Sequence, residues 1–103
     1  MALSSVFVTT AGNTVYTSSG NTAVTWLSLN NWGPSNVTAN LFAVPSGNSA
    51  GNINQIAYAL LLQSGDTYQI YVGNEKLLLS NGDFIKINAS DNTVTAVTSY
   101  TSV

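Results

Sequence analysis

Hydrophobic and polar side chains alternate with a period of two along most of this chain. The clearest example places Ile85, Ile87 and Ala89 on one face of an extended segment. Lys86 and Asn88 fall on the opposite face. Because successive side chains of a β-strand point to opposite sides of its sheet, this pattern predicts a strand with one buried face.

Two further segments show the same period. Residues 66–72 have an apolar face and a more polar face, formed by Tyr68, Ile70 and Val72 and by Thr67, Gln69 and Tyr71. In residues 54–62 the larger apolar side chains share one face and smaller residues share the other, namely Ile56, Tyr58, Leu60 and Leu62 against Gln55, Ala57 and Ala59. Both segments predict strands, with a short helix as the alternative for 54–62 because isoleucine, alanine and leucine also suit a helix.

Residues that close tight turns divide the chain at short intervals. Gly, Asn, Asp and Ser either tolerate positive φ or hydrogen-bond to their own backbone, and they cluster in stretches such as 64–66 and 81–83. These clusters separate eight expected strands, at residues 14–18, 22–29, 36–44, 54–62, 66–72, 75–79, 83–89 and 93–102. Turns about every 8–12 residues are typical of sandwiches and jelly rolls. We therefore expect one all-β domain over residues 1–103, an antiparallel β-sandwich of the jelly-roll or immunoglobulin-like kind with roughly eight strands.

Charge is scarce. Six side chains carry a formal charge at pH 7, and the chain contains no histidine, cysteine or arginine; the charged residues are Asp66, Glu75, Lys76, Asp83, Lys86 and Asp91. Histidine is the side chain that changes charge near neutral pH, and cysteine supplies both a nucleophile and a soft metal ligand. The sequence therefore predicts no catalytic residue, no cofactor and no metal ligand, and we expect the protein not to be an enzyme.

The balance of charge also bears on partners and location. The net charge is −2 and the sequence pI is about 4.2. Because no basic stripe is available for phosphates or anionic headgroups, we expect neither nucleic acid nor membranes as partners. Residues 1–8 have no basic segment and no long apolar stretch, so they do not predict a secretory signal, and we expect synthesis in a cytoplasm.

Three of the carboxylates, Asp66, Asp83 and Asp91, follow or lie within turns. Such side chains commonly accept hydrogen bonds from the backbone N–H groups of the turn, and we expect this role for all three. A calcium loop would gather several oxygen ligands at fixed spacing, and a glycoside hydrolase would pair two carboxylates. The residues around these aspartates match neither pattern.

The two tryptophans have different surroundings. Trp26 lies in a strand pattern beside Val24, which predicts packing in the core or between the sheets. Trp32 follows Asn31 in a turn-rich loop, where it can either pack over the end of the sandwich or contact a partner or ligand. Large aromatic side chains offer contact area at low entropic cost, so Trp32 and Tyr71 are our candidate contacts for an interface or a ligand.

The lack of charge has a further consequence for the sheet edges. Natural sheets protect free edges with lysine, proline or inward-pointing charges, and this chain has few of these residues. We therefore expect the edges to be covered by neighbouring molecules, and we expect a homo-oligomer or another assembly.

Several segments resemble those of small structural proteins from tailed-bacteriophage virions, notably those of cyanophages. The matching stretches are NTVYTSSGNTAV at 13–24, NLFAVPSG at 40–47, and GDTY at 65–68 leading into EKLLLSNGD at 75–83. They are made of turns and strands and contain no active site. The resemblance implies a β-sandwich located in the virion that decorates a capsid or forms part of the neck, tail or baseplate, with major capsid or tail proteins as partners.

Two classes of function follow. The first is a virion structural protein, with capsid decoration or cement as the leading placement and tail, neck or baseplate as the next. The second is a carbohydrate-binding or adhesion module in which Trp32 and Tyr71 would stack on sugar rings. Clustering of these aromatic side chains in one exposed cleft would favour the second.

Overall fold

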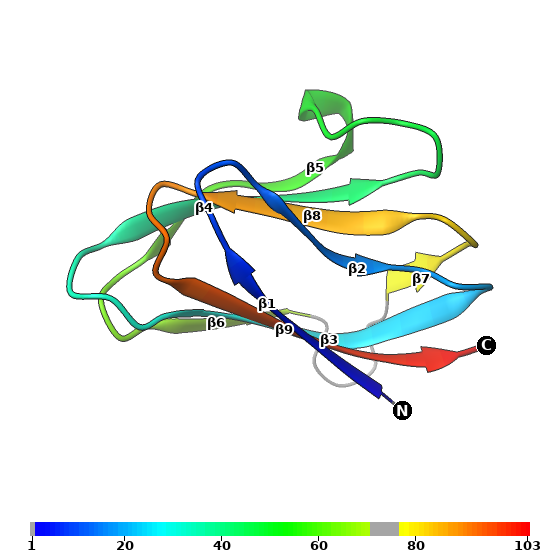
Figure 1. The fold of residues 1–103 in the computed structure, drawn as a ribbon, viewed down its shortest axis with the longest axis horizontal. Coiled ribbons are helices and arrows are strands. Elements are labelled where there is room, and N and C mark those ends of the chain that lie inside the picture. The colour runs from blue at the N-terminus through cyan, green and yellow to red at the C-terminus, as the bar shows by residue number, and fades with distance from the viewer. Residues whose placement is uncertain (1, 71–76) are drawn as a thin grey trace.

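Two antiparallel sheets packed face to face make up the structure, which is a computed structural model describing residues 2–70 and 77–103 (Figure 1). The first sheet has the order β1 (Ala2–Val8), β9 (Val94–Ser102), β3 (Thr22–Asn31) and β6 (Thr67–Ile70), and β7 (Leu77–Leu79) also pairs with β3. The second sheet has the order β2 (Asn13–Thr17), β8 (Phe84–Ala89), β4 (Val37–Val44) and β5 (Gln55–Leu62). A short 3-10 helix, η1 (Asn52–Asn54), precedes β5.

The strand pairing is that of one long hairpin rolled into a sandwich. β1 pairs with β9, β2 with β8, β3 with β6 and β7, and β4 with β5, so the two halves of the chain pair in reverse order. The loop between β4 and β5 is the tip of this hairpin. β9 then joins β3, and β8 joins β4, which completes the two sheets. This is the strand order of a jelly roll, so the predicted β-sandwich is confirmed and the immunoglobulin-like alternative is not the arrangement observed.

The core lies between the sheets and follows the predicted alternation closely in β8. Ile85, Ile87 and Ala89 are buried, whereas Lys86 and Asn88 are only partly buried. Leucine and isoleucine side chains from both sheets fill the rest of the core, the largest fully buried ones being Leu27, Leu29, Leu41, Leu62, Ile85 and Ile87. In β6, Tyr68 and Ile70 lie opposite the buried Leu29 and Leu27 of β3, as predicted, although Tyr68 is 39% exposed. Tyr71 and Val72 of the same predicted strand, and the first two residues of the predicted strand 75–79, lie outside the described residues.

One strand, β1, was not expected, so the part of the chain that the structure describes has nine strands rather than about eight. Its side chains do not separate polar from apolar faces. Leu3 and Phe7 are 68% and 65% exposed, whereas Val8 is fully buried. A strand that carries apolar side chains on both faces lacks the alternation on which the prediction depends.

The predicted face of residues 54–62 is wrong in its first half. Leu60 packs against the core and Leu62 is buried, but Ile56 and Tyr58 point outward and are exposed. The register explains the change of face. Ala39 of β4 pairs with Leu60 and Leu41 pairs with Ala57, so an advance of two residues along β4 corresponds to three residues along β5. The extra residue forms a β-bulge, in which Ala59 has a φ of +51°. One extra residue reverses the side to which the neighbouring side chains point, and a second shift follows between the partners of Leu41 and Phe42.

A second bulge overturns the expectation for Trp26. The register between β3 and β9 shifts between Val24 and Trp26, which leaves Thr25 as the extra residue. Val24 is therefore buried in the core, and Trp26 lies on the outer side of the sheet, partly buried and outside the core cluster. The prediction that Trp26 packs in the core is wrong for this reason.

Candidate functional site

The outer face of the first sheet carries exposed apolar side chains next to one another. Cross-strand pairing places Leu3 opposite Ser99 and Phe7 opposite Thr95, and Trp26 lies on the far side of Ser99. We call this surface the β1 face and define it by Leu3, Phe7, Trp26, Trp32 and Val97. The first two are among the most exposed large apolar side chains of the residues described.

Trp32 is held in one orientation at the end of the β1 face. Its Nε1 donates a hydrogen bond to Thr95 Oγ1 at 3.1 Å, and its backbone N–H donates to the Thr93 carbonyl oxygen at 3.0 Å. The Phe7 ring meets the indole edge-to-face with 6.4 Å between the centroids. The side chain nevertheless remains 55% exposed. Trp32 therefore contacts Phe7, Thr93 and Thr95 and leaves about half of its surface exposed, so its role as an interface or ligand contact stays a prediction.

Asn31 is fully buried, and its side chain holds the loop that carries Trp32 in place. Its Nδ2 donates to the carbonyl oxygens of Ser35 and Leu62 at 2.8 and 3.0 Å. Its Oδ1 accepts from the backbone N–H of Gly33 and from the hydroxyl of Thr93 at 3.1 and 2.9 Å. Every hydrogen-bonding atom of this amide is therefore engaged, and one side chain ties together three loops at this end of the sandwich.

The remaining positions of the β1 face are neutral and polar. Among the residues that the structure describes, the strand register places serine, threonine, asparagine and glutamine around the apolar group and no charged side chain; they are Ser5, Ser28, Asn30, Thr67, Gln69, Thr95 and Ser99. A partner that binds this face meets apolar area and neutral hydrogen-bonding groups. Its affinity would depend little on ionic strength, because screening acts on charge.

A second apolar surface lies on the opposite sheet. Ile56, Tyr58 and Leu61 point outward from β5, which is an edge strand, and Tyr58 is 75% exposed. We call these three residues the β5 surface. Because the outer faces of the two sheets point in opposite directions, the molecule presents apolar side chains on both of its broad sides.

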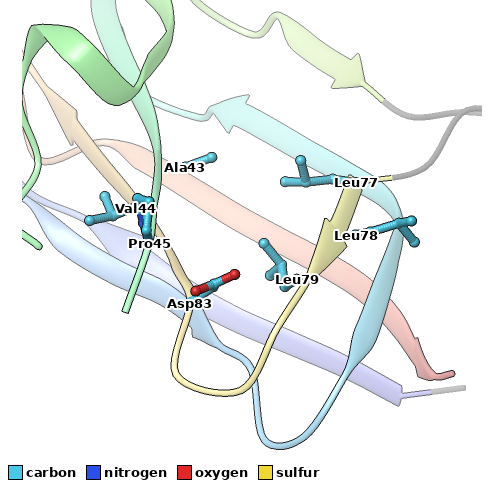
Figure 2. Close-up of a pocket in the computed structure, with 7 residues that line it drawn as sticks. All are labelled: Ala43, Val44, Pro45, Leu77, Leu78, Leu79 and Asp83. Carbon is cyan, nitrogen blue, oxygen red and sulfur yellow. The ribbon is translucent and has the colours of Figure 1, made fainter. Parts of the chain in front are cut away.

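A pocket of about 180 Å³ opens at the side of the sandwich, where the end of β4 faces β7. Its walls are Ala43, Val44 and Pro45 on one side, Leu77–Leu79 on the other, and Asp83 at the base. Figure 2 shows Ala43, Leu77 and Leu79 pointing toward the space between the two strands, whereas Leu78 points away from it. The pocket is therefore an apolar gap between the sheets.

The aspartates have the role that the sequence predicted. Asp66 Oδ2 accepts from the backbone N–H of Gln63, and Asp91 Oδ1 accepts from that of Asn92. Asp83 accepts from two backbone N–H groups, those of Ser46 and Ser80, both at 2.9 Å.

In the described ranges, no three side chains of the His, Cys, Asp or Glu type lie together. No helix in residues 2–70 and 77–103 is long and apolar enough to cross a membrane.

Tyr71, the other candidate contact from the sequence, lies outside the described residues, so its relation to Trp32 stays a prediction. Sequence reasoning missed Leu3, Phe7 and the β5 surface. One available indication was that Leu3 and Phe7 are four residues apart, which places both on the same side of an extended segment.

No protein-family model, curated protein or solved structure matches this chain significantly.

Proposed function

We propose that this chain is a non-enzymatic structural protein of a tailed-phage virion, with capsid decoration or cement as its leading placement and tail, neck or baseplate as the next. The observation that carries the proposal is the β1 face, where exposed Leu3, Phe7 and Trp32 lie on a sheet face whose described residues carry no charge. Contiguous exposed apolar side chains rimmed by polar residues mark interaction surfaces in soluble proteins.

The geometry of the β1 face suits an anchoring contact. Trp32 and Phe7 hold one another edge-to-face, and the Trp32 indole is further fixed by Thr95, so these rings lose little freedom when a partner covers them. Rigid aromatic side chains of this kind often supply most of the energy of an interface. The β5 surface on the opposite sheet gives the molecule a second contact, which is what a protein that joins neighbouring subunits needs.

The fold supports the proposal by analogy only. Jelly rolls occur in viral capsid domains and in lectins, and these are the two classes of function that the sequence left open. Fold alone does not decide between such classes, so the surface chemistry must.

The test is binding of the purified protein to capsids assembled without it, measured between about 50 and 500 mM salt. We expect binding that persists across this range, because the contact is neutral. Phe7→Asp should weaken binding at least tenfold by placing a charge in the apolar contact. Thr14→Asp is the matched control, since it places the same charge at an exposed position of β2 in the second sheet, away from the β1 face. Full binding by Phe7→Asp, or a steep loss of wild-type binding with salt, would argue against the proposal.

A carbohydrate-binding module is the second candidate, and the exposed indole of Trp32 favours it. This ring is fixed in place, and Thr95 and Asn30 next to it on the sheet are neutral hydrogen-bonding groups of the kind that sugar hydroxyls pair with. A panel of soluble glycans tested against wild-type protein and Trp32→Ala separates the candidates. A protein that ignores capsids but binds a glycan through Trp32 would replace the structural proposal with this one.

A further inference from the structure

Ile53 is the most exposed large apolar side chain of the described residues, and it lies on η1, at the end of the loop between β4 and β5. Its side chain is 97% exposed on η1. Figure 1 shows η1 and the preceding loop beyond β4 and β5 in this view, and η1 lies close to β4. An isolated isoleucine in this position gains nothing from the core of its own chain.

The loop is held in shape by hydrogen bonds. The Asn54 side chain accepts from the Gly51 N–H at 3.0 Å and donates to the Ser49 carbonyl oxygen at 3.0 Å. The start of the loop is tied to the body, because the Ser46 N–H donates to the Asp83 carboxylate. The tip is therefore preorganised, which lowers the entropic cost of inserting Ile53 into a partner.

The pocket between β4 and β7 has the size and chemistry to receive such a side chain. An apolar cavity of about 150 Å³ can hold benzene, and the four-carbon side chain of isoleucine is smaller than benzene. The pocket here measures about 180 Å³, and its walls are mostly alanine, valine, proline and leucine. Its single carboxylate, that of Asp83, already accepts from the Ser46 and Ser80 N–H groups, so an apolar occupant leaves it paired.

We propose that two copies of this chain form a closed dimer in which Ile53 of each copy enters the pocket of the other. Pro45 is both a wall of the pocket and the start of the loop that carries Ile53, so the projecting side chain and the pocket belong to the same end of the molecule. A twofold axis beside this end lets both insertions form at once, and the assembly closes at two copies. The low net charge of −2 opposes this pairing only weakly. The inference uses a different surface from the proposed virion contact and stands independently of it.

Sedimentation equilibrium on the full chain tests the dimer, at concentrations up to about 0.5 mM. We expect a monomer–dimer equilibrium for the wild type. Ile53→Asp should raise its dissociation constant at least tenfold, and Ala43→Phe, which fills the pocket from its own wall, should do the same. Leu3→Asp is the matched control on the β1 face and should dimerise normally. A wild type that stays monomeric, or an Ile53→Asp variant that dimerises as tightly as the wild type, would overturn the proposal.

Disulfide trapping identifies the contact itself and does not depend on how well Ala43→Phe folds. Because the chain has no natural cysteine, Ile53→Cys and Ala43→Cys can be made as separate single-cysteine chains, one carrying a mass tag. Mixed under mild oxidation, they should give mainly the 53–43 crosslink between chains. A mixture dominated by 53–53 crosslinks, or one without crosslinks between folded chains, would show that Ile53 does not enter the partner's pocket. Failure of capsid binding by Phe7→Asp would leave both results unchanged.

Discussion

Replacing Asn31 with alanine should be among the most destabilising single changes in this protein. The substitution leaves four hydrogen-bonding partners without the amide. Ser35 and Thr93 are not fully buried, so water can replace their bonds. The Leu62 carbonyl and the Gly33 N–H belong to buried residues and lose their partner without replacement. A buried polar group left unpaired costs about 1–3 kcal/mol, so the two together predict a loss of about 2–6 kcal/mol.

That loss is large compared with the total free energy of unfolding, because domains of this kind are stable by about 5–15 kcal/mol. Equilibrium urea unfolding followed by tryptophan fluorescence measures it, and we expect a lower midpoint with an unchanged slope. Asn36→Ala is the control, because Asn36 is exposed and its side chain accepts one hydrogen bond, from the Ser64 N–H at 3.2 Å. That variant should lose less than about 1 kcal/mol. Equal losses at the two positions would refute the reasoning.

Asn31→Asp tests the assigned orientation of the Asn31 amide through the pH dependence of the stability loss. The carboxylate would face the carbonyl oxygens of Ser35 and Leu62, which repel it, and burial also disfavours its charge. The pKa of this introduced carboxyl should therefore be higher in the folded than in the unfolded chain. The penalty is then full above the folded-state pKa and shrinks as the pH falls through that value. A difference from wild type that grows with decreasing pH would contradict the assigned orientation of the amide.

Three further outcomes are expected. Ile85→Ala or Ile87→Ala should cost about 2–5 kcal/mol and Lys86→Ala under about 1 kcal/mol in the same urea assay, and equal costs at all three would contradict the assigned faces of β8. Thr98→Val should raise stability by about 1 kcal/mol, because Thr98 Oγ1 is buried and has no hydrogen-bond partner among the described residues; a loss would show that the hydroxyl is paired. The melting temperature should shift by no more than a few degrees between about pH 5.5 and 8.5, since no histidine or cysteine is present to titrate there.

Local alternation was enough to predict the sheet content but not which side chains reach the surface. It succeeded in β8, where no bulge interrupts the pairing with β4. It failed at Tyr58 and Trp26, because each lies beside a bulge that depends on how two distant strands pair. A sequence read one segment at a time contains no information on that register.

The candidate site was predicted only in part for a related reason. Trp32 was singled out from its size and its turn-rich surroundings, whereas Phe7 gained its importance from lying against Trp32. The pocket could not be anticipated either, because β4 and β7 come together only through the rolling of the long hairpin. A site that depends on one residue, such as Trp32, could be predicted from the sequence. Sites that form where distant segments meet, such as the Phe7–Trp32 contact and the pocket, could not.

The place of β9 in the first sheet sets the order in which the chain can mature. β9 lies between β1 and β3, and in the described structure it is the strand that joins them. β9 leaves the ribosome after all the other described strands, so β1 waits for its partner until β9 has been synthesised. Pairing between segments so distant in sequence also makes folding slow, on the scale of milliseconds to seconds. Because β1 carries Leu3 and Phe7, a chain truncated before β9 cannot assemble the β1 face, and only copies that contain β9 can form it.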